Sequence, residues 1–394
     1  MATTNRFRHQ TYQSERPTSQ YQLLPTVSPI DPQAIECKDL LATSGIAFRR
    51  ANVEAIYCVH GTFAGNDALG LLTELSRFTP GLSHALSRFV KKTVDWVAGE
   101  TGNFTPQFVS TLQNALTHHA NDRIPVRLFN WSSQNNHIGR ADGAIRLIYE
   151  LAKRAESIPA NRIQAMHPPR VLLWGHSHGG NVFALVTNLL AAEKEARDQF
   201  FHAARTFYQS CFLGKVDLPV WQEVRELLDN NEHPIRDLKL DIATFGTPVR
   251  YGWDADGYEQ LLHFIHHRQA PESAEYLAPF PLEVGRMLKA ADGDYIQQIG
   301  ISGTNIVPLP IAFRTFLADW RLDNFLERKV PRMRLLNRLR HRTRVHDAGT
   351  TLLVDYTDVA PSIHQNLAGH TLYTRRKWLP FHCQQIAKRF YEKD

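Results

Sequence analysis

The chain has 394 residues, of which 43% are hydrophobic and 21% are charged, with 45 Lys and Arg against 39 Asp and Glu. These proportions are typical of a globular protein and exclude a disordered or fibrous chain. No stretch approaches the roughly 20 apolar residues that cross a bilayer, so we predict no membrane-spanning helix.

The first 40 residues are predicted to form a polar extension ahead of the folded domain. Residues 1–35 are rich in Arg, Gln, Ser, Thr and Pro and lack the apolar block of a secretory signal. We therefore expect a cytoplasmic protein, or one exported by a route that needs no N-terminal signal peptide. The four cysteines are widely spaced, so we expect neither a disulfide nor a zinc site.

Residues 41–394 are predicted to form one α/β domain. Short apolar runs predict six strands, at 55–59, 126–129, 171–174, 240–245, 295–301 and 351–354. Helical spacing of apolar residues appears between them, at 144–155 and 181–190. This alternation indicates a doubly wound, mostly parallel sheet.

Three connections are longer than a compact α/β core requires, at about 64–122, 191–236 and 303–345. We expect these segments to be helical insertions that form a cap or lid.

The segment Gly175-His176-Ser177-His178-Gly179 lies between the predicted strand 171–174 and the predicted helix 181–190. A tight strand-to-helix turn can present a serine hydroxyl as a nucleophile, and the crowded flanking positions favour glycine. We therefore predict Ser177 as the catalytic nucleophile. The alternative is a glycine-rich turn with an idle serine.

A loop containing His60-Gly61-Thr62 follows the predicted strand 55–59. Attack on an ester produces an oxyanion that two backbone N–H groups must stabilise. The amide of His178 is expected to be one donor, and this loop is expected to supply the other.

The segments VHGTF, GHSHGG and ATFGTPVR, in this order, resemble the serial motifs of bacterial lipases and esterases of the α/β-hydrolase superfamily. The resemblance covers roughly residues 53–390. It implies the α/β-hydrolase fold, with the amide of Thr62, or of its neighbour Phe63, as the second oxyanion donor. It also implies that the chain order is nucleophile, acid, histidine.

The catalytic base is accordingly expected near the C-terminus, ahead of the last helix. His370 follows Gly369 in a polar loop at this place, and His364 is the alternative. His382 is expected to lie on the last helix itself.

The acid must orient the histidine and stabilise its positive charge. Asp347, in His346-Asp347-Ala348-Gly349, resembles the Asp-Gly turn that carries the acid in bacterial lipases, and we predict it as the third catalytic residue. Other carboxylates remain open as alternatives: Asp355, Asp358, Asp254 and Asp256.

The expected function is that of a lipase-like serine carboxylester hydrolase that acts through an acyl-enzyme on a small-molecule or lipid ester, without a metal or organic cofactor. His263, His266 and His267 are interpreted as polar-face residues of a helix ending near Arg268 rather than as metal ligands. Two alternatives remain: an antibacterial phospholipase effector that acts on membrane lipids, and a non-catalytic lipid-binding protein with the same fold.

A basic run extends from Arg328 to Arg344 and contains eight Lys or Arg residues and no acidic one. It could hold the protein on an anionic membrane, because each surface cation contributes about 1 kcal/mol there. The other interpretation is a solvated helix face paired with acids elsewhere in the fold. No recognised DNA- or RNA-binding motif accompanies the run, so we expect no nucleic-acid binding.

Overall fold

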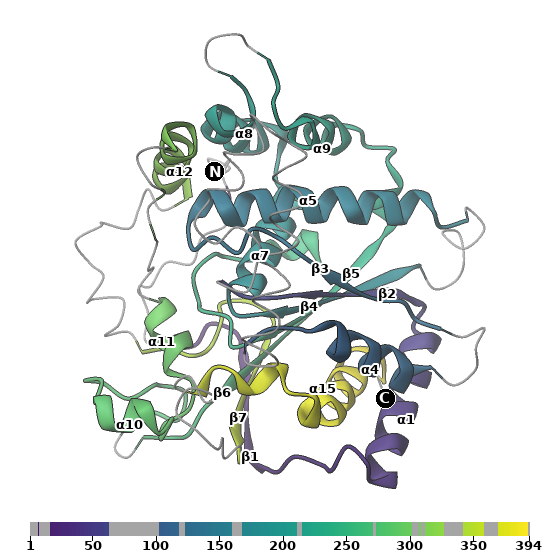
Figure 1. Ribbon diagram of the computed structural model, residues 1–394, viewed down its shortest axis with the longest axis vertical. Helices are drawn as coiled ribbons and strands as arrows, with labels where there is room; N and C mark the ends of the chain where they lie inside the picture. Colours follow the sequence, from purple (N-terminus) through teal and green to yellow (C-terminus); the bar gives the residue numbers. More distant parts are fainter. Residues whose placement is uncertain are drawn as a thin grey trace.

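A parallel β-sheet forms the centre of the protein, as a computed structural model shows (Figure 1). The structure describes residues 7, 16–62, 102–117, 123–159, 168–210, 215–270, 273–301, 306, 308, 312–326, 342–357 and 369–392. Within these residues the strands are β1 (Gln20–Val27), β2 (Val53–Val59), β3 (Val126–Phe129), β4 (Arg170–His176), β5 (Lys239–Phe245), β6 (Gln260–His266) and β7 (Thr350–Tyr356). Their order across the sheet is β1-β7-β6-β5-β4-β2-β3, and every described pair of neighbours is parallel.

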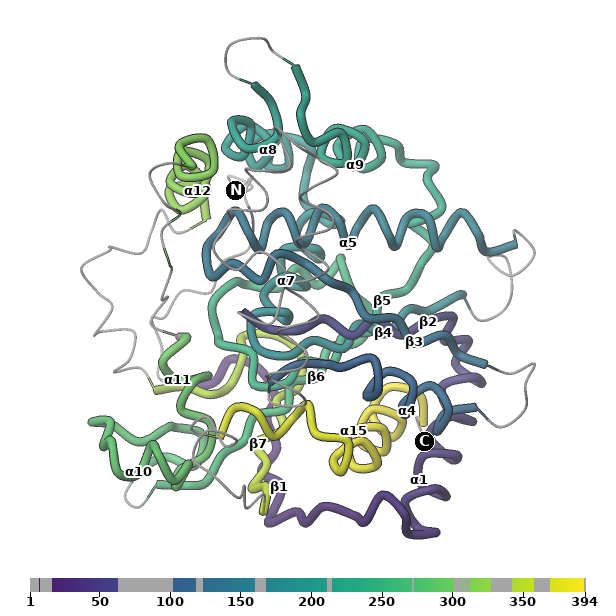
Figure 2. Tube along the Cα trace, in the orientation of Figure 1, coloured from purple at the N-terminus to yellow at the C-terminus, as the bar shows by residue number. Residues whose placement is uncertain are grey.

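Helices cover both faces of the sheet, as parallel strands with long crossovers require (Figures 1 and 2). One face carries α5 (His137–Glu156), α7 (His178–Ala191), α8 (Lys194–Tyr208), α9 (Pro219–Asp229) and α12 (Phe313–Leu326). The other carries α1 (Ile35–Arg50), α4 (Pro106–Leu116) and α15 (Leu379–Ile386). Short helices complete the described chain: η2 (Pro234–Asp237), η3 (Ala255–Gly257), α10 (Val284–Leu288), α11 (Tyr295–Ile301), η6 (Leu372–Thr374), η7 (Arg376–Trp378) and η8 (Ala387–Tyr391).

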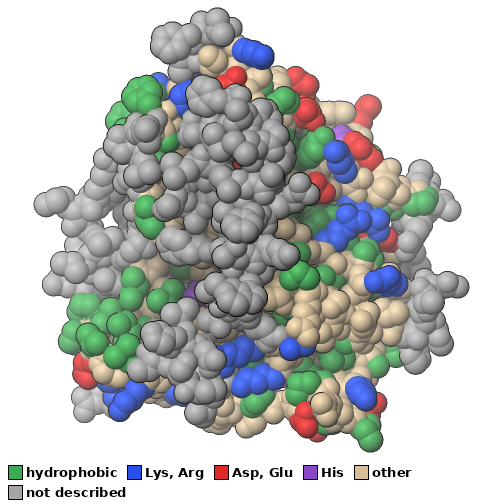
Figure 3. Space-filling model, viewed as in Figure 1, with side chains coloured by type: hydrophobic (Ala, Val, Ile, Leu, Met, Phe, Trp, Pro, Cys, Tyr) green, Lys and Arg blue, Asp and Glu red, His purple; other side chains and the backbone are tan. Residues whose placement is uncertain are grey.

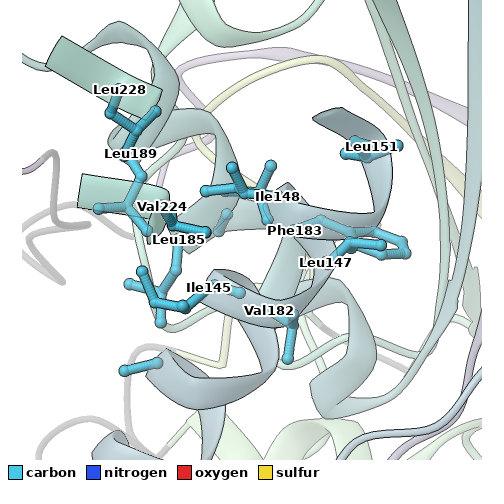
Figure 4. Close-up of a cluster of buried hydrophobic side chains, with 14 of the residues drawn as sticks. Ile145, Leu147, Ile148, Leu151, Val182, Phe183, Leu185, Leu189, Val224 and Leu228 are labelled. Atoms are coloured by element: carbon cyan, nitrogen blue, oxygen red, sulfur yellow. The ribbon is translucent and has the colours of Figure 1, made fainter. Parts of the chain in front are cut away.

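The core on the α5 and α7 side is built from apolar residues at helical spacing (Figure 4). Ile145 and Ile148 of α5 lie beside Leu185 and Leu189 of α7, and α9 closes the cluster with Val224. All five side chains are fully buried or nearly so. Because α7 packs here, its first residue is held rigidly at the carboxyl end of β4.

Five of the six predicted strands are present, but residues 295–301 form the helix α11 instead. The carboxylate of Asp294 accepts a hydrogen bond from the backbone N–H of Gln297 at 2.8 Å, which is the contact of an N-cap. A short apolar run such as residues 295–301 is compatible with either a helix or a strand, and this cap favours the helix.

Two strands, β1 and β6, were not predicted. β6 contains His263 and His266, which we had assigned to a helix; in the sheet, His263 hydrogen-bonds to Thr244 of β5 at 2.6 Å. β1 is an edge strand paired with β7, and it lies inside the predicted polar extension of residues 1–40. The folded structure therefore begins before residue 41.

Each predicted insertion contains at least one helix among its described residues: α4 lies within 64–122, α8 and α9 within 191–236, and α12 within 303–345. Their role as a cap stays a prediction, and residues 63–101 lie outside the described part. No helix among the described residues is long and apolar enough to cross a membrane.

Most of the basic run, residues 328–341, also lies outside the described residues. Its last member, Arg344, is fully buried and donates hydrogen bonds to the carbonyls of His266, Asp292 and Asp294. Arg344 therefore does not belong to a solvated or membrane-facing basic surface, and the predicted contact between the other basic residues and an anionic membrane stays untested.

Candidate active site

Ser177 occupies a sharp turn between β4 and α7, with φ of 54° and ψ of −130°. A non-glycine residue rarely adopts a positive φ, and such strain persists only where neighbouring contacts hold it. Here the backbone N–H of Ser177 donates to the carbonyl of Phe245 at 2.8 Å. The Ser177 carbonyl accepts from the hydroxyl of Thr247 at 2.9 Å and from the N–H of Gly180 at 3.0 Å. The end of β5 thus fixes the turn.

Glycines around Ser177 meet a steric demand, although their neighbours are not those that we expected. Gly175 and Gly179 were expected to crowd each other. Instead, a Cβ on Gly179 would lie 2.5 Å from the carbonyl oxygen of Val59, and one on Gly175 would lie 2.4 Å from the ring of Phe183. The turn is therefore packed tightly between the end of β2 and the first turns of α7.

The predicted oxyanion loop lies directly against the serine. A Cβ on Gly61 would lie only 3.2 Å from Ser177 Oγ, so the glycine allows this loop to approach the hydroxyl. Thr62 follows in the loop and is half-buried, while His178 is buried as the first residue of α7. Phe63 lies outside the described residues.

His370 is paired with a buried carboxylate, that of Asp294. Its Nδ1–H donates to Asp294 Oδ2 at 2.7 Å, and the hydroxyl of Tyr373 donates to the same oxygen at 3.0 Å. Burial by itself raises the pKa of Asp294, but the opposite charge of His370 and these hydrogen bonds, with the Gln297 amide and Arg344, outweigh it and hold the pKa below its ordinary value. Asp294 is therefore an ionised carboxylate that can stabilise an imidazolium.

The second nitrogen of His370, Nε2, is buried and has no hydrogen-bond partner among the described residues. With Nδ1 donating to Asp294, Nε2 is the nitrogen left to act as a general base. The His370 ring lies 4.6 Å from the ring of His176, the residue next to Ser177. The structure thus brings the predicted base to the same end of the sheet as the predicted nucleophile.

His176 supports His370 and was not predicted from the sequence. Its Nε2–H donates to the backbone carbonyl of His370 at 3.0 Å. Burial, assisted by the nearby charge of His370, lowers the pKa of His176 to about 3. His176 is therefore neutral at pH 7 and acts as a fixed hydrogen-bond donor.

The structure corrects the predicted partner of His370: it is Asp294 and not Asp347. Asp347 lies just before β7, its Oδ1 is buried without a hydrogen-bond partner among the described residues, and burial raises its pKa to about 6. The Asp-Gly turn on which we chose Asp347 occurs also at Asp292-Gly293, one residue before Asp294. Asp294 was nevertheless not among the carboxylates that we considered from the sequence.

The remaining candidates lie apart from this pair. Asp355 forms an ion pair with Arg268 at 2.6 Å, and Asp254 caps η3 by accepting from the N–H of Asp256. His382 lies on α15, as predicted, and is hydrogen-bonded to the hydroxyl of Tyr356 at 3.0 Å. His364 and Asp358 lie outside the described residues.

The described part of the chain contains no group of three or more His, Cys, Asp or Glu side chains arranged to hold a metal ion. His263, His266 and His267 each hydrogen-bond within the fold, to the carbonyls of Ala348, Val354 and Glu275 respectively.

A scan against protein-family models, a search of curated proteins and a search of solved structures each gave no match for this chain.

Proposed function

We propose that the protein is a serine carboxylester hydrolase with Ser177 as nucleophile, His370 as general base and Asp294 as the acid that orients it. The observation that carries the proposal is the buried Asp294–His370 pair, at the same end of the sheet as a serine in a strained strand-to-helix turn. In the described part of the chain, His370 Nε2 has no hydrogen-bond partner. Such a strained turn and an activated histidine are the two requirements of serine nucleophilic catalysis.

In the proposed mechanism, His370 Nε2 takes the hydroxyl proton while Ser177 Oγ attacks the ester carbon. The alcohol leaves with that proton and an acyl-enzyme remains. A water molecule, deprotonated by the same nitrogen, then attacks the acyl carbon, and the carboxylic acid and the free serine result. The N–H groups of Thr62 and His178 stabilise the oxyanion in both steps, and Asp294 stabilises the imidazolium.

A lipid ester is the favoured substrate class, because the segment that carries Asp294 also exposes apolar side chains. Val284 and Leu288 of α10 are 67% and 41% exposed, and Phe280 and Ile296 are 38% and 39% exposed. Hydrophobic side chains gather over this part of the molecule at the lower left of Figure 3. Exposed apolar groups near a site suit an ester with a long acyl chain.

Hydrolysis of p-nitrophenyl esters of increasing acyl length tests the proposal. Ser177→Ala is expected to lower kcat by about 10⁴-fold or more, whereas Ser110→Ala, which removes an exposed hydroxyl on α4, is expected to change nothing. Equal rates for wild type and Ser177→Ala would overturn the proposal.

A fluorophosphonate probe and phospholipid vesicles separate the alternatives. Labelling of Ser177 is expected, and release of fatty acid from vesicles would identify a phospholipase. Binding to vesicles by folded protein without labelling or hydrolysis would instead favour a non-catalytic lipid-binding protein.

A further inference from the structure

The loop of residues 60–62, which approaches Ser177, is held by residues 131–133, which follow the neighbouring strand β3. β2 and β3 are adjacent and in register, with Val59 opposite Phe129. Residues 60–62 and residues 131–133 therefore leave the sheet side by side. Trp131 and Ser133 are both buried in this position.

Two hydrogen bonds connect these segments. Trp131 Nε1 donates to the carbonyl oxygen of His60 at 2.8 Å, and Ser133 Oγ donates to the carbonyl oxygen of Gly61 at 2.5 Å. His60 Nδ1 adds a third contact, to the same Gly61 oxygen, at 3.0 Å. Two consecutive carbonyls of the loop are thus directed toward residues 131–133.

The direction of the Gly61 carbonyl determines the direction of the next N–H. A trans peptide is planar, so its C=O and N–H point in opposite directions. When the Gly61 carbonyl is held by Ser133, the N–H of Thr62 points away from Ser133. Free rotation of this peptide would remove the second proposed oxyanion donor.

Ser133 itself is strained, with φ of 67°. Glycine would adopt this conformation without cost, whereas a residue with a Cβ is strained in it. The hydroxyl bond to Gly61 gives a physical reason for a serine at this position.

We propose that Ser133 is a positioning residue that sets the Thr62 N–H as an oxyanion donor. This inference rests on the proposed hydrolase function, and Ser133 acts through the loop rather than on the substrate.

Kinetics of Ser133→Ala and Ser133→Gly test this role, with Ser132→Ala as the matched control. Ser132 is the adjacent buried serine, and its hydroxyl contacts the N–H of Gln134. Both Ser133 variants are expected to lower kcat for a p-nitrophenyl ester by about 10- to 100-fold, a part of the loss that removal of one donor causes, with KM within twofold of wild type. Binding of a trifluoromethyl ketone, whose adduct carries the oxyanion, is expected to weaken by the same factor.

Stability separates positioning from a merely structural role. Ser133→Gly relieves the backbone strain and Ser133→Ala does not, so Tm is expected to be higher for glycine while the loss in kcat is the same for both. The inference would be overturned if kcat of the two Ser133 variants rose and fell with their Tm. It would also be overturned if either folded variant kept a kcat within twofold of wild type. Trp131→Phe, which removes the bond to His60 together with part of the buried indole packing, is expected to lower kcat too and provides the test if neither Ser133 variant folds.

The two proposals fail in different ways. Hydrolysis retained in Ser177→Ala would reject the hydrolase itself. Hydrolysis lost in Ser177→Ala but unchanged in the folded Ser133 variants, or lost equally in Ser132→Ala, would reject only the role of Ser133.

Discussion

The candidate site joins two halves of the sheet that are built in different ways. In the half formed by β2, β3 and β4, the turn at Ser177 directly follows a strand, and its loops leave neighbouring strands together. In the half formed by β5, β6 and β7, Asp294 lies in a long excursion between β6 and β7, residues 267–349. There Asp294 is held by Tyr373 and Arg344, which are distant in sequence.

This difference explains which half can be recognised from sequence. A tight turn imposes steric demands on adjacent residues, so it leaves a local pattern of glycines. Apart from the cap contact with Gln297, the donors to the Asp294 carboxylate are distant in sequence and leave no pattern near it. The following predictions test whether the two halves depend on each other as the structure indicates, from the largest expected effect to the smallest.

Replacement of each candidate acid in turn, Asp294 and Asp347, gives the largest expected difference in kcat. Asp294→Asn removes the charge that orients His370 and stabilises its positive form, so kcat for a p-nitrophenyl ester is expected to fall by about 10⁴-fold. Asp347→Asn, with no bond to His370, is expected to stay within a few-fold of wild type. The reverse order of the two kcat values would restore the acid that we predicted from sequence.

Arg344 connects the excursion to the end of β6, through the carbonyls of Asp292, Asp294 and His266. Arg344→Met leaves these buried carbonyls without their donor and is expected to lower the free energy of unfolding by about 3 kcal/mol. Urea denaturation measures this change. Surface replacement of Lys289, which is exposed on the same excursion, is the control and should leave the midpoint unchanged.

Gly246 tests how the half formed by β5, β6 and β7 holds the Asp294–His370 pair, because it follows β5 and faces this pair. Its φ is +60°, and a Cβ would lie 2.5 Å from the ring of Tyr373 and 2.7 Å from Asp294 Oδ2. Gly246→Ala is expected to displace the pair, with a loss in stability of about 1–2 kcal/mol and a measurable loss in kcat. Gly285→Ala on α10, where a Cβ would meet nothing within 4 Å, is expected to change neither.

As the pH falls, the half formed by β5, β6 and β7 is expected to unfold locally before the other half. Among the described residues, burial lowers the pKa of five histidines on this side: His263, His266, His267, His346 and His382. On the Ser177 side it lowers the pKa of His176 and His178.

The sign of the effect follows from proton binding. The folded state keeps these rings neutral to about pH 3 for His267, His346 and His382, whereas the unfolded chain protonates them near 6.5. Stability is therefore full above pH 6.5 and falls below it by about 1.4 kcal/mol per pH unit for each histidine. Hydrogen exchange at decreasing pH should show β6 and β7 losing protection before β2 and β4; the opposite order would contradict this account.

The sequence by itself determined the elements whose pattern is local. The buried strands β2, β3, β4, β5 and β7 were predicted from continuous apolar runs, and α5 and α7 from helical spacing. The turn at Ser177 and the loop at Gly61 were located because close approach of backbone requires glycine at fixed positions. His370 was placed by its position ahead of the last helix.

Only the tertiary structure decided which carboxylate meets His370. Asp294 and His370 come together because α11 is capped by the Asp294 carboxylate and because Arg344 fixes the excursion against β6. The strands β1 and β6 also required the sheet, since one is an edge strand and the other carries histidines whose hydrogen-bond partners lie on or beside the neighbouring strands β5 and β7. Contacts between residues distant in sequence have no local signature, and for this reason the Asp294–His370 contact and these two strands could not be predicted.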